Sequence, residues 1–110
     1  MSAAGIEAVF LESHNWGAAA AFFRSLGFTL DFETDHRSGQ LRGAEGPYVF
    51  VAEVPEDRDP GLRVVLRVPA GFRPPEGVEV VSELATTHWG TQEMAVRDPD
   101  GRVWTLQVGP

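Results

Sequence analysis

The chain has 110 residues, of which 43% are hydrophobic and 23% charged, an ordinary composition for a globular protein. A chain of this length buries roughly two-thirds of its unfolded surface, so we expect a single domain over residues 1–110. It has no cysteine, which excludes disulfides, thiolate nucleophiles and cysteine metal sites. No apolar run approaches the ~20 residues of a membrane span, and residues 1–5 contain no basic segment leading into an apolar core. We therefore expect a soluble cytoplasmic protein that contacts no membrane.

The charge pattern argues against nucleic acid as a partner. The formal net charge is -7, and every basic residue is an arginine. These arginines are scattered along the chain, whereas nucleic-acid binding needs a concentrated basic surface. An acidic surface weakly favours cationic ligands, although it also simply keeps a protein soluble.

The first half predicts a strand, a helix and three more strands. Residues 6–12 mix apolar and β-branched side chains, which indicates a strand. Asn15 is a suitable N-cap for a helix over residues 16–26, and Gly27 suits the left-handed position that ends one. The helix has an apolar stripe that can pack against a sheet, at Ala19, Phe22, Phe23 and Leu26. Further strands are expected at residues 28–33, 40–43 and 48–54, with a turn at 35–39.

The second half begins after a segment of turn-formers and charges, residues 55–61, which reads as a linker between two modules at about residues 5–54 and 62–110. Strands are expected at residues 62–69 and 78–82. A hairpin follows, formed by residues 92–97 and 102–107 around Asp98-Pro99-Asp100-Gly101, in which proline fixes φ and glycine permits positive φ.

A weak internal repeat of about fifty residues aligns residues 45–51 with 100–106. The second copy lacks room for its helix, because only eight residues separate Val68 from Gly77 and they include Pro74-Pro75. We predict a loop or a single turn there. If Val64, Leu66 and Val68 face a central cavity, then Arg63, Val65 and Arg67 face the place of the missing helix, either in water or covered by another subunit.

Two motifs resemble the vicinal oxygen chelate superfamily, which includes glyoxalase I, extradiol dioxygenases, fosfomycin-resistance enzymes and metal-free bleomycin-resistance proteins. One is Trp-Gly-Thr-x-Glu at residues 89–93, followed by Arg-Asp-Pro-Asp-Gly at 97–101 and Leu106. The other is Asn15-Trp16 followed by residues 21–28. The resemblance implies an α+β fold, in which two βαβββ modules form a curved mixed sheet with the second-module helix shortened or lost. It also implies a homodimer.

The resemblance places metal ligands at positions that cannot ligate in this chain. The first ligand position is Ala8, and the last is Thr105, where metal-using relatives usually have Glu. By the internal repeat the remaining positions are Phe50 and about Val64. The three histidines form no pair with metal-ligand spacing and are interpreted as surface or loop residues. We expect no metal and no cofactor.

The same positions predict a concave pocket with an aromatic lining. Side chains alternate faces along a strand, so Phe10, Tyr48 and Phe50 share one face, with Thr105 and Gln107 as hydrogen-bonding groups. An apolar cavity with a few polar points is typical of a small-molecule site. Trp89, before the terminal hairpin, is predicted to close over a ligand. The plainer alternative is that these residues fill a small core.

The function expected is a metal-free protein that binds a small organic molecule, aromatic or cationic, and sequesters a toxic or antibiotic natural product without catalysis. The ligand-binding residues predicted are Phe10, Tyr48, Phe50, Trp89, Thr105 and Gln107. Alternatives are a metal-dependent glyoxalase-like lyase, isomerase or dioxygenase, and an interaction module without a pocket. Glu12 is the one acid predicted to face the cavity, where it could serve as a base.

Overall fold

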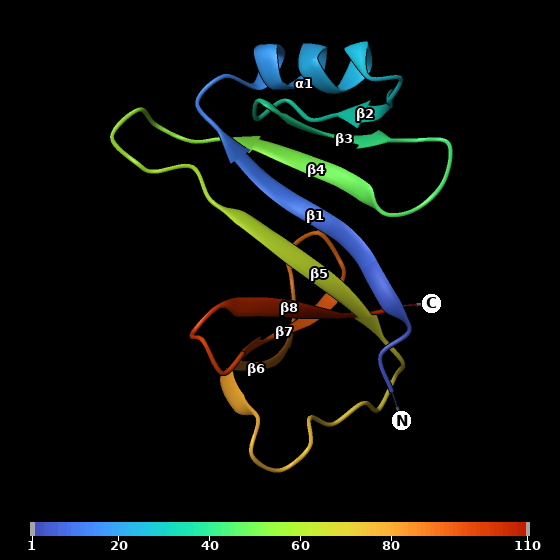
Figure 1. Ribbon diagram of the computed structural model, residues 1–110, viewed down its shortest axis with the longest axis vertical. Helices are drawn as coiled ribbons and strands as arrows, with labels where there is room; N and C mark the ends of the chain where they lie inside the picture. The colour runs from blue at the N-terminus through green and yellow to red at the C-terminus, as the bar shows by residue number, and fades with distance from the viewer. Residues whose placement is uncertain (1, 110) are drawn as a thin grey trace. The chain divides into compact units, whose positions relative to one another are not determined.

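The computed structural model describes residues 2–109, which form one helix and eight strands in two compact units (Figure 1). The first unit is residues 8–62, and the second combines residues 2–7 with residues 63–109. The elements in chain order are β1 (Gly5–Ser13), α1 (Trp16–Ser25), β2 (Thr29–Glu33), β3 (Ser38–Arg42), β4 (Tyr48–Glu53), β5 (Leu62–Val68), β6 (Glu79–Thr86), β7 (Gln92–Arg97) and β8 (Val103–Val108). At ten residues α1 is too short to cross a membrane, and residues 2–109 contain no other helix.

In the first unit the strands lie in the order β2-β3-β4-β1. β1 and β4 are parallel, while β2 with β3 and β3 with β4 are antiparallel. A parallel pair needs a crossover connection, and α1 supplies it, covering one face of this sheet. The predicted strand, helix and three strands are therefore confirmed in order and type.

Local chemistry sets both ends of α1. The side-chain Oδ1 of Asn15 accepts a hydrogen bond from the amide of Ala18 at 2.9 Å, as expected of an N-cap. Oε1 of Glu53 accepts another from the amide of Trp16 at 2.9 Å, so a strand end provides a second cap. Gly27 follows the helix with φ at 100°, a left-handed conformation that glycine adopts without strain.

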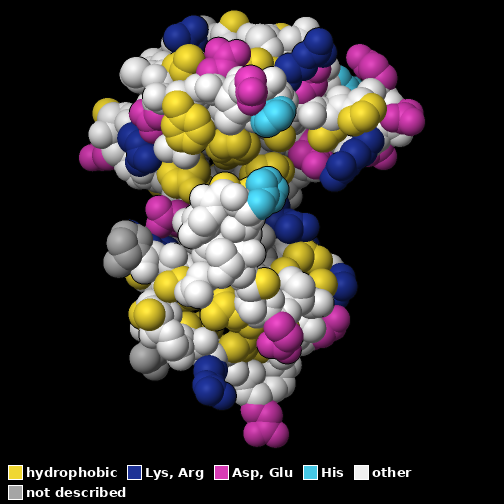
Figure 2. Space-filling model, turned by 180° about the vertical axis from the view of Figure 1, so that it is seen from behind, with side chains coloured by type: hydrophobic (Ala, Val, Ile, Leu, Met, Phe, Trp, Pro, Cys, Tyr) yellow, Lys and Arg dark blue, Asp and Glu magenta, His cyan; other side chains and the backbone are white. Residues whose placement is uncertain are grey.

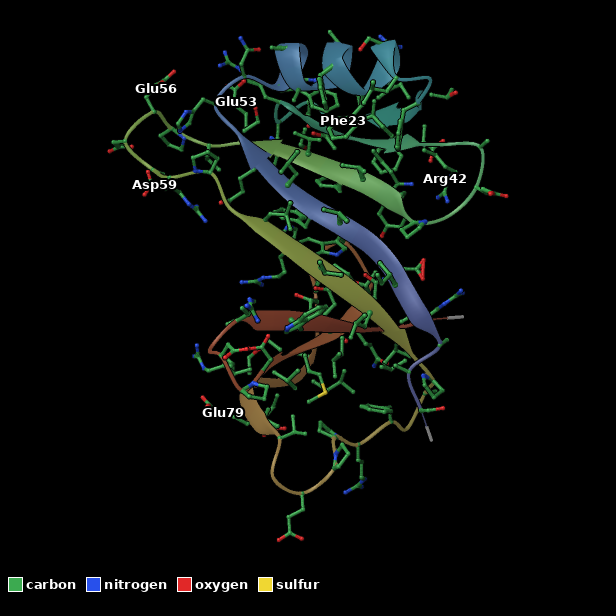
Figure 3. The ribbon with its side chains drawn as sticks, in the orientation of Figure 1. Phe23, Arg42, Glu53, Glu56, Asp59 and Glu79 are labelled. Atoms are coloured by element: carbon green, nitrogen blue, oxygen red, sulfur yellow. The ribbon has the colours of Figure 1, made fainter. Side chains whose placement is uncertain are left out.

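The core of the first unit lies between α1 and the sheet. Its buried residues are Trp16, Ala20, Leu41 and Val51, and Phe23 packs against them from the helix (Figure 3). The Trp16 ring reaches β3 so closely that a Cβ atom on Gly39 would lie 2.6 Å from its Cη2. Only glycine therefore fits at this position of β3 without movement of its neighbours.

The second unit repeats the topology of the first without its helix. Its strands lie in the order β6-β7-β8-β5, with β5 parallel to β8 and the other pairs antiparallel. Strands β5 to β8 thus correspond to β1 to β4. Residues 69–78 form two turns and no helix, because Pro74-Pro75 removes amide donors there. The predicted α+β fold of two βαβββ modules with the second helix lost is confirmed.

The side of the second unit that corresponds to the α1 side is covered by the chain itself. The buried residues are Val68, Met94 and Leu106, and Phe72 from the 69–78 loop packs against them together with Leu66. The orientation predicted for β5 was therefore wrong.

The register explains the error in β5. Val65 pairs with Thr105, and Arg67 with Gln107, so the side chains of Arg63, Val65 and Arg67 share the opposite face with Thr105. Arg67 also forms an ion pair with Glu7, with Nε and Oε2 separated by 3.2 Å.

Two strand boundaries differ from their predictions. β3 begins at Ser38 rather than at residue 40, because pairing with β4 extends to Ser38 opposite Ala52. β6 continues to Thr86 rather than ending at residue 82, because β7 pairs with it as far as Thr86 opposite Gln92. In both cases a neighbouring strand recruits residues that lack a strong local preference.

Candidate ligand-binding face

The face of the first unit opposite α1 carries the predicted aromatic residues. Leu11, Val49 and Val51 belong to the core beneath α1, and alternation along a strand turns their neighbours the other way. The parallel register pairs Ala8 with Tyr48, Phe10 with Phe50, and Glu12 with Ala52. Phe10, Tyr48 and Phe50 therefore come together on one face, which we call the aromatic face.

Three phenylalanines form a row across the aromatic face. The rings of Phe10 and Phe50 are stacked with centroids 5.6 Å apart and planes inclined by 13°. Phe32 from β2 lies beyond Phe50, at 6.3 Å between centroids. Phe10 and Phe50 are half-buried, and Phe32 is 47% exposed. Hydrophobic side chains are visible on the surface of this unit in Figure 2.

A β-bulge explains how Phe32 joins the row. Leu30 pairs with Leu41, but Phe32 pairs with Gln40, so the register shifts at Asp31. Leu30 packs in the core beneath α1, whereas Asp31 and Phe32 both contact residues of the aromatic face. Such a bulge re-aims side chains, which strict alternation does not allow. Strand parity alone could not have identified Phe32 as part of this face.

A polar network borders the row at the end of β3. Oδ2 of Asp31 accepts hydrogen bonds from Nε2 of Gln40 at 3.0 Å and from Nε of Arg42 at 2.9 Å. The bond from Gln40 and then the bond and charge of Arg42 hold the pKa of Asp31 below its usual range, so it stays ionised. The Arg42 guanidinium carbon lies 5.3 Å from the centre of the Tyr48 ring.

The other end of the aromatic face carries Glu12, the acid suggested as a base. Its side chain is 15% exposed and forms an ion pair with Arg58, with Oε2 and Nη2 separated by 2.7 Å. Its Oε1 accepts a hydrogen bond from the amide of Gly61 at 3.0 Å. Through these two contacts Glu12 anchors the 55–61 segment.

The remaining predicted residues lie in the second unit. Thr105 is 6% exposed, between Val65 of β5 and Ala95 of β7. Gln107 shares its face and is paired with Glu93. Oε2 of Glu93 accepts a hydrogen bond from Nε1 of Trp89 at 3.4 Å. The structure thus brings Trp89 to the Gln107 end of that face.

Two hollows occur away from the six predicted residues. One, of about 590 Å³, lies between α1 and β2. Its lining residues are Trp16, Gly17, Ala20, Ala21, Arg24, Ser25, Leu30 and Glu33. The other, of about 230 Å³, is in the second unit and is lined by Ser2, Ala4, Arg67, Val68, Pro69 and Gly109. In the larger hollow the indole of Trp16 is already bonded to Glu33, with Nε1 and Oε2 3.0 Å apart, and none of the six predicted residues lines either hollow.

Solved structures show which fold this is. A glyoxalase/bleomycin resistance protein/dioxygenase superfamily member from Vibrio splendidus 12B01 superposes with a TM-score of 0.69, covering 94% of this chain and 99% of its own at 16% identity. The chain has the vicinal oxygen chelate fold. Methylmalonyl-CoA epimerase from Mycobacterium tuberculosis is similar too, with a TM-score of 0.70 and 15% identity over 98% of this chain and 89% of that one.

The sequence comparisons add no activity to this fold. No protein-family model matches the sequence, and no curated protein matches it either. The bleomycin resistance determinant encoded on the transposon Tn5 reaches a TM-score of only 0.42, at 18% identity over 93% of this chain and 95% of that one. That score is too low to carry an argument.

The metal-ligand positions of the vicinal oxygen chelate fold do not fit a metal ion here. The register aligns Val65 with Phe10 through their partners Thr105 and Phe50, so Ala8 corresponds to Arg63 rather than to Val64. The four positions hold alanine, phenylalanine, arginine and threonine, which offer one hydroxyl where a divalent ion needs several donors. Within residues 2–109 no three His, Asp or Glu side chains gather around a possible metal position.

Proposed function

We propose that this protein binds a small, flat organic molecule on the aromatic face. The observation that carries the proposal is the stacked pair Phe10 and Phe50 with Phe32 beside it, on the side of the sheet that α1 leaves uncovered. Aromatic pairs contribute about 0.5–1.5 kcal/mol beyond the area they bury. A flat ligand that stacks on these rings gains that energy together with the burial of its own apolar surface.

We further propose that the ligand is held without a metal and without chemistry, as in sequestration of a toxic or antibiotic natural product. The ligand positions of the fold offer a single hydroxyl to a metal, and the carboxylate of Glu12 is already engaged by Arg58 and Gly61. A general base must be within reach of the proton it abstracts, whereas these two contacts hold the Glu12 carboxylate against the 55–61 segment. These residues support binding better than a lyase, isomerase or dioxygenase reaction.

The test is an NMR titration of the ¹⁵N-labelled protein with a library of flat aromatic compounds. We expect saturable shifts in β1, β3 and β4 for at least one compound, and their loss in Phe50→Ala. Phe22→Ala is the matched control, because Phe22 lies on α1, away from the aromatic face, and is 57% exposed. It should bind like the wild type.

Two results would count against the proposal. One is a library without any binder. The other is an equal loss of affinity in Phe50→Ala and Phe22→Ala, which would mean that the loss comes from lower protein stability rather than from a missing contact on the aromatic face. Phe32→Ala guards against misfolding of the first variant, because Phe32 is half-exposed and its truncation leaves the core beneath α1 intact.

The single domain, the homodimer and the cytoplasmic location inferred from the sequence stay predictions. So does the part of Thr105, Gln107 and Trp89 in binding. Light scattering at several protein concentrations tests the dimer directly. The Trp89→Ala variant tests whether Trp89 takes part in binding, through the affinity of whichever compound binds the wild type.

A further inference from the structure

The polar end of the aromatic face specifies the class of ligand, on the basis of the proposed function. We infer that the ligand is a planar aromatic acid, whose ring stacks on Phe50 and Phe10 and whose carboxylate binds the terminal nitrogens of Arg42.

Arg42 is held by one edge of its guanidinium. Its Nε donates to Asp31 at 2.9 Å, and its guanidinium carbon lies 5.3 Å from the centre of the Tyr48 ring. The side chain is still 47% exposed. In residues 2–109 no acceptor takes a hydrogen bond from Nη1 or Nη2 of Arg42, so that edge of the fork is open. A guanidinium edge of this kind matches the two oxygens of a carboxylate.

The position of Arg42 matches the length of an aryl acid. Gln40 pairs with Phe50 and Leu41 with Val49, so Arg42 stands opposite Tyr48, two residues from Phe50 along β4. Two residues of an extended strand span about 6.6 Å. A carboxylate attached to one or two fused rings covers that length, so both contacts are satisfied by one molecule. Figure 3 shows Arg42 beside the loop that joins β3 to β4.

Charge favours an acid over a cation at this end of the face. A cationic ligand group near Tyr48 would be repelled by the guanidinium of Arg42, which already lies over that ring. The carboxylate of Asp31 fixes Arg42 through Nε and leaves the other edge for a second anion. The net charge of -7 repels anions at long range, but at physiological salt the Debye length is about 8 Å. The short-range attraction between the Arg42 guanidinium and a ligand carboxylate therefore decides which charge the ligand carries.

Three matched probes test the inference: 2-naphthoate, its neutral amide and 2-naphthylmethylammonium, each titrated by NMR at pH 7. We expect the acid to bind the wild type about tenfold or more tightly than the amide, since hydrogen bonds between charged groups are the stronger kind. In Arg42→Gln the affinity for the acid should fall to that for the amide. The affinity for the amide should stay as in the wild type.

Arg97→Gln is the matched control for Arg42→Gln. Nε of Arg97 also donates to a carboxylate, that of Glu79 at 3.0 Å, but in the second unit. This variant should keep the preference for the acid.

The failures of the two proposals are distinguishable. Equal affinity for acid and amide, or tightest binding of the ammonium compound, overturns the inference about the acid while binding on the aromatic face stands. If Arg42→Gln binds neither the acid nor the amide, the inference is also overturned, because Arg42 would then only maintain the structure of the aromatic face. If no probe and no library compound binds the wild type, the proposed function itself fails.

Discussion

Trp104 donates a hydrogen bond from its indole Nε1 to Oδ2 of Asp98, at 3.0 Å, and so ties the turn of the terminal hairpin to its second strand. Oδ1 of the same carboxylate accepts hydrogen bonds from the backbone amides of Asp100 and Arg102, each at 2.9 Å. The side chain of Asp98 is mostly buried at 18% exposure. This single carboxylate therefore organises the whole Asp-Pro-Asp-Gly turn.

The first prediction is an acid-sensitive contribution of Asp98 to stability. The bond from Trp104, then the bonds from Arg102 and Asp100, lower the pKa of Asp98 from 3.8 to about 2. A lowered pKa in the folded state means that this contribution is fully present above pH 4 and is lost as the pH falls towards 2. The gap in Tm between wild type and Asp98→Asn should be constant above pH 5 and shrink below pH 4.

Trp104→Phe is the control for that prediction, because it removes only the indole donor. The pKa of Asp98, followed by NMR titration of its carboxyl carbon, should rise towards 3.8 in this variant. An unchanged pKa would show that the indole does not hold the carboxylate.

The second prediction concerns the contact between Gly39 and Trp16. In Gly39→Ala the new Cβ meets Cη2 of Trp16 at 2.6 Å and the carbonyl oxygen of Phe32 at 2.7 Å. Overpacking of this kind costs about 1–3 kcal/mol. Urea unfolding measures the loss, and the indole N–H resonance of Trp16, bonded to Glu33 at 3.0 Å, should shift.

The matched control is Gly17→Ala in α1. A Cβ atom there meets only Oδ1 of Asn15, at 3.6 Å, and alanine stabilises a helix relative to glycine by roughly 0.5–1 kcal/mol. The two substitutions should therefore change the free energy of unfolding in opposite directions. Equal effects of the two would argue against the packing of Trp16 on β3.

The third prediction tests the loop that replaces the second helix. Phe72 is the residue of the 69–78 loop that packs against the core of Val68, Met94 and Leu106, and it is partly buried. Phe72→Ala should lower the free energy of unfolding by about 1–3 kcal/mol, less than the 3–5 kcal/mol of a fully buried phenylalanine. Phe22→Ala, at an exposed site, should stay within about 0.5 kcal/mol of the wild type. If Phe72→Ala has no effect, the loop does not cover this core.

The fourth prediction is that metals do not stabilise the protein. A metal present at 100 times its dissociation constant would add about 2.7 kcal/mol, or several degrees in Tm. We expect no shift when Zn, Ni, Mn, Fe(II) or Co is added to EDTA-treated protein, because Ala8 cannot ligate a metal and Thr105 offers only one hydroxyl. Stoichiometric metal in the untreated protein, together with a shift, would reassign the chain to the metal-dependent enzymes of this fold.

Local chemistry made much of the fold predictable. Asn15 and Gly27 mark the ends of α1, and Asp98 and Gly101 define a hairpin, because caps and turns depend on residues within a few positions of one another. The loss of the second helix followed from Pro74-Pro75 for the same reason. Phe10, Tyr48 and Phe50 also share a face as predicted, since side chains alternate within regular strands.

Only the tertiary structure decided how the strands meet. The pairing of Val65 with Thr105 turned the side chains of β5 to the face opposite the one predicted, because a shift of one residue reverses every side chain of a strand. The bulge at Asp31 added Phe32 to the aromatic face and aimed Asp31 at Arg42. Registers and bulges are set by the neighbouring strand, a partner distant in sequence, and so the polar end of the candidate site could not be derived from the chain alone.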